Sequence, residues 1–74
     1  MEETTRFDLH RLLLARLERI SADSVWAHRA SGVRGALLRV LEKLENGRPV
    51  HGSELRRLTE MGFHILEESA KEKF

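Results

Sequence analysis

Apolar residues recur along this chain at spacings of three and four, the pattern of amphipathic helices, in three separate stretches. The first stretch starts at Leu9 and predicts a helix over residues 5–22, with Thr5 or Asp8 capping its first turn. The residues predicted to face the core from this helix are Leu9, Leu12, Leu13, Leu17 and Ile20. Polar residues at 21–24 predict a break before the next helix.

The second stretch has the clearest pattern and predicts a helix over residues 24–46. Gly47 can adopt the left-handed backbone conformation that ends a helix, and Pro49 cannot continue one. We therefore expect this helix to end near Glu45. Its predicted buried face consists of Trp26, Ala30, Val33, Leu37, Val40, Leu41 and Leu44.

A third helix is predicted over residues 53–71, with Ser53 as its N-cap. Gly62 lies in the middle of its apolar face, where glycine costs about 1 kcal/mol relative to alanine, so we expect another helix to approach closely there. No stretch alternates apolar and polar residues as a strand would. The chain therefore predicts an all-α fold, a small three-helix antiparallel bundle made of a helical hairpin plus one further helix and completed by oligomerisation.

Length and composition narrow the classes of protein to consider. The 74 residues are expected to form one helical domain over residues 1–74, and their apolar runs are too short to span a membrane. The chain has no cysteine and an acidic N-terminus, which favours a cytoplasmic location over a secreted one. Thirteen basic and twelve acidic residues leave a net charge of +1, so no global field selects nucleic acid as partner.

Candidate catalytic and metal-binding residues do not form a recognisable set. Four histidines are present, but none is paired with another at the spacing of helical metal ligands: His10, His28, His51 and His64. Glu60, His64 and Glu67 share a helix face, which is predicted to be solvated because it lies opposite the apolar stripe. We expect neither an enzyme nor a bound cofactor or metal ion.

A second apolar face is predicted beside the core stripes. Small residues recur every four positions on the second helix, next to a leucine, and two further apolar residues lie off the stripe of the first helix. Together these residues form the candidate interface of a homodimer: Phe7, Leu14, Ala27, Ser31, Gly35 and Leu38. The rival account is that the first helix covers this face within the same chain.

Two functions are consistent with these patterns. The first is a small, non-enzymatic protein-interaction or regulatory module that acts through helix surfaces as a homodimer, with a partner-binding corner at Trp26, His28, Arg29 and Arg34. The alternative is a nucleic-acid-binding accessory protein that uses an arginine-rich helix surface. The arginines assigned to that alternative are Arg11, Arg16, Arg29, Arg34 and Arg39.

Overall fold

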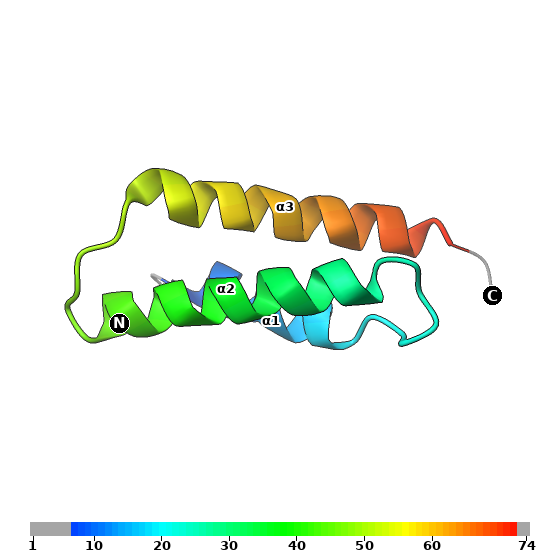
Figure 1. Cartoon of the computed structure of the whole chain (residues 1–74), viewed down its shortest axis with the longest axis horizontal. Helices are drawn as coiled ribbons and strands as arrows, with labels where there is room; N and C mark the ends of the chain where they lie inside the picture. Colours follow the sequence, from blue (N-terminus) through cyan, green and yellow to red (C-terminus); the bar gives the residue numbers. More distant parts are fainter. Residues whose placement is uncertain (1–6, 73–74) are drawn as a thin grey trace.

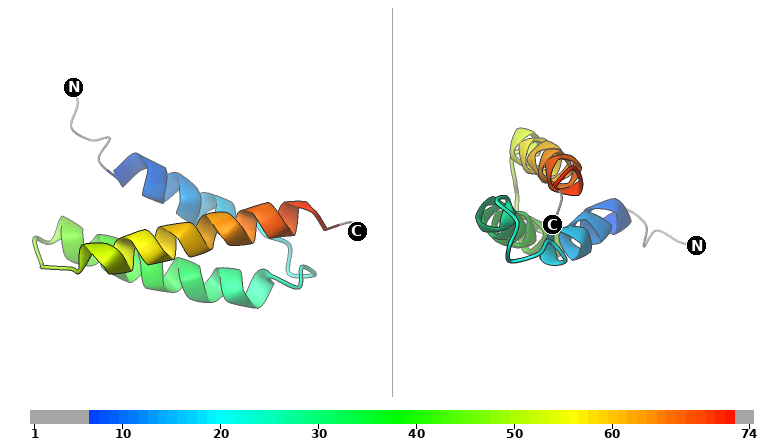
Figure 2. Two further views of the ribbon diagram at one scale, coloured as in Figure 1. Left: turned by 90° about the horizontal axis from the view of Figure 1, so that it is seen from above. Right: turned by 90° about the vertical axis from the view of Figure 1, so that its right-hand side faces the viewer.

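The computed structural model describes residues 7–72, which form three helices joined by two loops (Figure 1). Helix α1 spans Asp8–Glu18, α2 spans Ala27–Glu45 and α3 spans Gly52–Ala70. Helix α2 runs antiparallel to the other two, so α1 and α3 run in the same direction, and the N-terminal end of α1 diverges from the bundle (Figure 2). Each helix contacts both of the others. The predicted all-α antiparallel bundle is therefore confirmed.

The core lies between the three helices, and α2 contributes most of it. The predicted face of α2 is confirmed: Leu37 is fully buried, and only Trp26 and Leu44, near the two ends of the helix, are half-buried. A period of 3.6 residues places these side chains on one side of the helix, where they meet both neighbours. The buried apolar residues are Leu13, Leu17, Ala30, Val33, Leu37, Val40, Leu41, Leu58 and Ile65.

The start and end of α1 differ from the prediction. The N-cap residue is Phe7, whose side chain cannot accept a hydrogen bond, and Asp8 is the first helical residue rather than the cap. Thr5 lies outside the described residues. The helix ends at Glu18 instead of residue 22, because the chain from residue 19 turns to bring α2 back along the bundle.

The face that α1 buries is also rotated from the predicted one. Leu13 and Leu17 are buried as expected, but Leu9 and Leu12 are 53% and 51% exposed. Leu14, predicted to lie off the stripe, packs against the core instead. Six apolar residues surround more than half of this short helix, so its sequence alone does not fix which of them face inward.

The loop over residues 19–26 is tied to the end of α3. Ser24 is 8% exposed, and its hydroxyl donates a hydrogen bond of 2.5 Å to Glu72 Oε1. The backbone N–H of Val25 donates to Glu72 Oε2 at 3.1 Å, and the N–H of Trp26 donates to Ser24 Oγ at 3.0 Å. These bonds satisfy donors at the start of α2, which begins at Ala27 rather than at the predicted residue 24.

Helix α2 ends as predicted, at Glu45. Gly47 has a φ of 74°, and its N–H donates to the carbonyl of Leu44 at 3.1 Å. The N–H of Arg48 donates to the carbonyl of Lys43 at 2.8 Å. These two bonds form a Schellman motif, in which a left-handed glycine lets the chain satisfy the last carbonyls of the helix.

Helix α3 begins at Gly52, one residue before the predicted start. Its N-cap is His51, which makes no side-chain capping bond, and Ser53 lies inside the first turn, so the prediction that Ser53 caps the helix is wrong. Gly62 is buried, and a Cβ at this position would lie 2.9 Å from Leu13 Cδ2. The predicted close approach at Gly62 is therefore confirmed.

Among residues 7–72, no helix combines the length and apolar character needed to cross a membrane.

Candidate functional site

Three large apolar side chains of α1 and α3 remain exposed: Leu9, Leu12 and Phe63, the last at 43% exposure. The Leu13–Gly62 contact brings the two helices together at this level. The opposite side of α1 faces α2, because Arg11 and Glu18 form ion pairs with residues of that helix. By helix periodicity, Leu9 and Leu12 therefore lie on the side of α1 next to α3. Met61 of α3 faces α2, so Phe63, two residues further on, lies on the other side of α3, next to α1. We call these three residues the α1–α3 apolar surface.

Charged residues flank the α1–α3 apolar surface on both helices. On α1, Asp8 lies at the N-terminal end, and Arg16 and Arg19 lie at the C-terminal end. On α3, Arg56 lies toward the N-terminus and Glu67 toward the C-terminus. All five are exposed, and none forms an ion pair within residues 7–72. The two helices run in the same direction. From N-terminus to C-terminus, these charges change from negative to positive on α1 and from positive to negative on α3.

The six residues of the interface predicted from the sequence do not lie on one exposed surface. Phe7 and Leu14 pack against the core of their own chain, so they are not available as a separate apolar spot. Ala27 and Ser31 line a shallow hollow at the end of α1. The C-terminal half of the small-residue row stays open, because a Cβ at Gly35 would meet only the Arg39 guanidinium, at 3.8 Å. Leu38, beside it, is 38% exposed.

The predicted partner-binding corner is only partly assembled. Trp26 packs edge-on against His64 with ring centroids 5.7 Å apart, and the Arg29 guanidinium carbon lies 5.2 Å from the centroid of the Trp26 ring. His64 belongs to α3 and was not predicted to join this corner, because helix spacing says nothing about contacts between helices. His28 is exposed. Arg34 forms an ion pair with Glu18 of α1, with Arg34 Nη1 3.6 Å from Glu18 Oε2.

The arginines assigned to nucleic-acid binding do not converge on one surface. Arg11 pairs with Glu45, and Arg34 pairs with Glu18, both on the side where α1 meets α2. Arg29 stacks on Trp26 on the side of α2 that faces α3. A phosphate-binding patch needs several unpaired cations on one surface, and these contacts separate the arginines and neutralise two of them.

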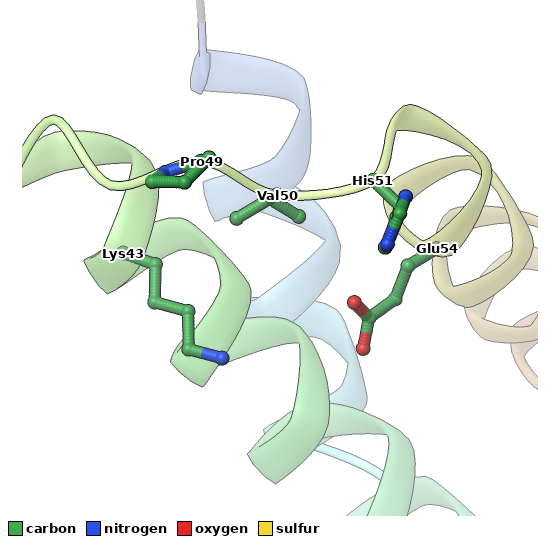
Figure 3. Close-up of a pocket in the computed structure, with 5 residues that line it drawn as sticks. All are labelled: Lys43, Pro49, Val50, His51 and Glu54. Carbon is green, nitrogen blue, oxygen red and sulfur yellow. The ribbon is translucent and has the colours of Figure 1, made fainter.

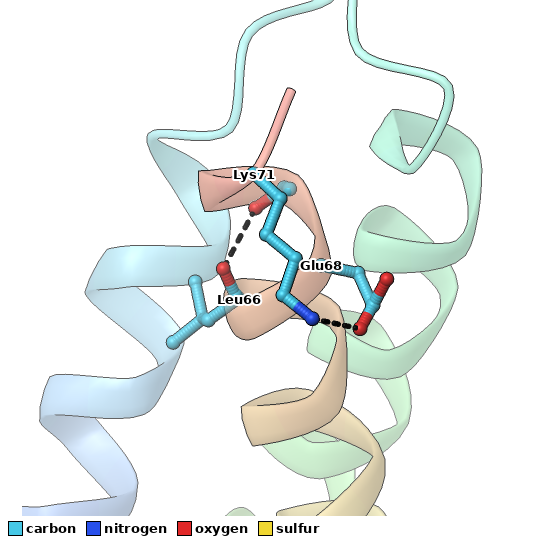
Figure 4. Close-up of polar contacts among 4 residues, drawn as sticks. Leu66, Glu68 and Lys71 are labelled. Atoms are coloured by element: carbon cyan, nitrogen blue, oxygen red, sulfur yellow. Dashed lines mark hydrogen bonds and ion pairs between the residues drawn. The ribbon is translucent and has the colours of Figure 1, made fainter. Parts of the chain in front are cut away.

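A group of polar side chains lies at the C-terminal end of α3. One potential metal-ligand atom from each of His64, Glu67 and Glu68 lies within 4.8 Å of the others. Lys71 Nζ donates to Glu68 Oε2 at 3.1 Å (Figure 4), and this bond and the Glu68 charge, followed by Glu67, raise the pKa of Lys71. Since Lys71 already neutralises Glu68, the cluster is accounted for as an exposed ion pair on a helix surface.

The loop between α2 and α3 borders an open hollow of about 320 Å³. Figure 3 shows its lining: His51 and Glu54 project from the start of α3 toward the side on which Lys43 of α2 lies, with Pro49 and Val50 above. Within residues 7–72 the lining includes an imidazole, a carboxylate and an ammonium group but no hydroxyl or thiol nucleophile. This arrangement does not supply the nucleophile and base pair of covalent catalysis.

Comparison of the chain with protein-family models, with curated proteins and with solved structures finds no match.

Proposed function

We propose that this protein is a non-enzymatic interaction module that acts through its helix surfaces and associates with a second copy of itself. The observation that carries the proposal is the exposure of Leu9, Leu12 and Phe63 on neighbouring edges of α1 and α3. Single exposed apolar residues are ordinary, but three large ones on one surface favour a contact with another protein.

The charges beside this surface favour a second copy as the occupant. In a dimer whose two-fold axis runs along the helices, α1 of one subunit faces α3 of the other. Asp8 then lies near Arg56 of the partner subunit, and Arg19 lies near Glu67 of the partner subunit. Since a two-fold interface repeats every contact twice, four pairs of opposite charge surround the apolar centre.

The expected dimer is weak. Fully burying a leucine or phenylalanine contributes about 1.5–3 kcal/mol, so covering a half-exposed one contributes about 1 kcal/mol. Six such side chains in the dimer contribute about 6 kcal/mol, against an association cost of about 4 kcal/mol or more. We therefore expect a dimer that forms at high protein concentration and dissociates on dilution.

Light scattering over a concentration series tests the proposal. The expected result is a mass that rises from one chain toward two, and a Leu12→Glu substitution should hold it at one chain. Val25→Glu is the matched control, because Val25 is 82% exposed in the loop between α1 and α2 and lies outside the α1–α3 apolar surface. A single-chain mass at millimolar concentration, or a dimer indifferent to Leu12→Glu, would contradict the proposal.

The nucleic-acid alternative has less support, because two of its five arginines are paired with glutamates of the same chain. Titration against duplex and single-stranded nucleic acid at two salt concentrations separates the two functions. Binding of nucleic acid with a steep salt dependence would favour the alternative. The interaction module predicts no such binding.

A further inference from the structure

A second surface lies between α2 and α3, on the side of the bundle where Arg29 contacts Trp26. It is an open groove of about 340 Å³. Val33 and Leu58 are buried beneath it, and Ala36 and Met61 are half-buried along its walls. We call it the α2–α3 groove; its floor is apolar, and among the residues that the structure describes no acidic one lines it.

Gly32 lines this groove, and no contact within residues 7–72 requires a glycine at this position. A glycine in mid-helix costs about 1 kcal/mol relative to alanine. At Gly62 this cost has a cause, because a Cβ there would collide with Leu13, but a Cβ at Gly32 would have no neighbour within 4 Å. Gly32 therefore leaves open space over the α2 backbone, with Ala36 one turn further on. Small residues at this spacing allow another helix to pack closely.

Two arginines border the groove, one on each helix. Arg29 is held against the Trp26 ring, with its guanidinium carbon 5.2 Å from the ring centroid. Arg57 lies on α3, and its Nη1 atom is 3.6 Å from Sδ of Met61, which forms part of the groove wall. Both arginines are exposed, and neither pairs with a carboxylate within residues 7–72. Their charges are therefore available to a partner on either side of the floor.

We infer that the α2–α3 groove binds an amphipathic helix whose apolar stripe is flanked by acidic residues. The apolar stripe would contact Ala36 and Met61 along the groove walls. The helix backbone would approach over Gly32, and carboxylates would pair with Arg29 and Arg57. Nucleic acid fits less well, since a phosphate backbone would leave the apolar walls at Ala36 and Met61 uncovered. The inference rests on the proposed role as an interaction module, but not on the dimer contact, which lies on the α1–α3 side.

The test uses a synthetic peptide of about 18 residues, long enough to form a helix, with leucines on one face, glutamates beside them and no aromatic residue. A matched peptide carries lysine in place of glutamate. Trp26 is the only tryptophan of the chain and contacts Arg29, so its fluorescence reports binding at the groove. We expect saturable binding of the acidic peptide only, weakened about tenfold or more by Arg29→Glu or Arg57→Glu.

Leucine substitutions at two glycines separate groove binding from general charge attraction. Gly32→Leu should block binding of the acidic peptide, whereas Gly35→Leu should leave it unchanged, because Gly35 does not line the groove. Circular dichroism confirms that each variant is helical. Equal binding of both peptides, binding unaffected by Gly32→Leu, or selective binding of a duplex DNA would overturn the inference. Light scattering of the same samples reports the dimer separately, so the two proposals can fail independently.

Discussion

Gly62 of α3 leaves the space that the side chain of Leu13 of α1 occupies. A Cβ at position 62 would lie 2.9, 3.1 and 3.2 Å from Leu13 Cδ2, Cδ1 and Cγ, closer than side-chain carbons normally approach. Leu13 is 1% exposed and sits in the core cluster, so it cannot move aside without disturbing other packed residues. This contact sets the distance between α1 and α3, and with it the position of the α1–α3 apolar surface.

Gly62→Ala should lower the free energy of unfolding. Overpacking costs about 1–3 kcal/mol, which exceeds the gain of about 1 kcal/mol from alanine's helix propensity. The effect should reverse in a Leu13→Ala background, where the added methyl group has room. Gly32→Ala is the matched control and should raise the free energy of unfolding, because its Cβ meets nothing within 4 Å. Urea unfolding compares the unsubstituted chain with the four variants: Gly62→Ala, Leu13→Ala, their double variant and Gly32→Ala. Destabilisation by Gly32→Ala would show that steric contact is not the cause.

His10→Leu should stabilise the protein by about 1 kcal/mol. His10 Nδ1 is buried and has no hydrogen-bond partner within residues 7–72. An unsatisfied buried polar atom costs about 1–3 kcal/mol, which leucine at the same position would remove. His28→Leu, at an exposed position, should change the free energy of unfolding by less than about 0.5 kcal/mol. Thermal unfolding compares the two, and a lower melting temperature for His10→Leu would refute this account of His10.

Glu72→Ala should destabilise the protein by about 1–3 kcal/mol. The carboxylate of Glu72 accepts hydrogen bonds from the Ser24 hydroxyl and the Val25 N–H, and its loss would leave the hydroxyl of the buried Ser24 without this partner. Glu67→Ala, which removes an exposed carboxylate from the last turns of α3, serves as the control. Hydrogen exchange should accelerate at residues 24–27 in Glu72→Ala alone. Unchanged exchange there would mean that the α3 end does not hold the loop.

The sequence predicts the fold best where the backbone conformation at a position accepts only one kind of residue. The end of α2 is an example, since only a residue tolerant of positive φ suits position 47, and glycine is there. The buried face of α2 is equally predictable, because its large apolar residues, Leu38 apart, occupy a single sector of the helix.

Prediction from sequence fails where several residues satisfy the same local pattern. Apolar residues cover much of α1, and only its contacts with α2 and α3 determine that Leu14 packs inward while Leu9 stays exposed. The α1–α3 apolar surface and the α2–α3 groove depend on how helices are placed side by side. Periodicity within one helix carries no information about that placement, so Phe63 and Arg57 could not be assigned to a surface from sequence.

Disulfide trapping tests whether two copies of the chain meet through the α1–α3 apolar surface. The chain has no native cysteine, so introduced thiols are the only ones present. A mixture of Leu12→Cys and Phe63→Cys proteins, mildly oxidised at high concentration, should give a mixed disulfide dimer in high yield. Leu38→Cys alone should cross-link poorly, because Leu38 lies on α2, outside that surface. Efficient cross-linking of Leu38→Cys, without a mixed Leu12→Cys and Phe63→Cys product, would show that the two copies meet through α2 and not through the α1–α3 apolar surface.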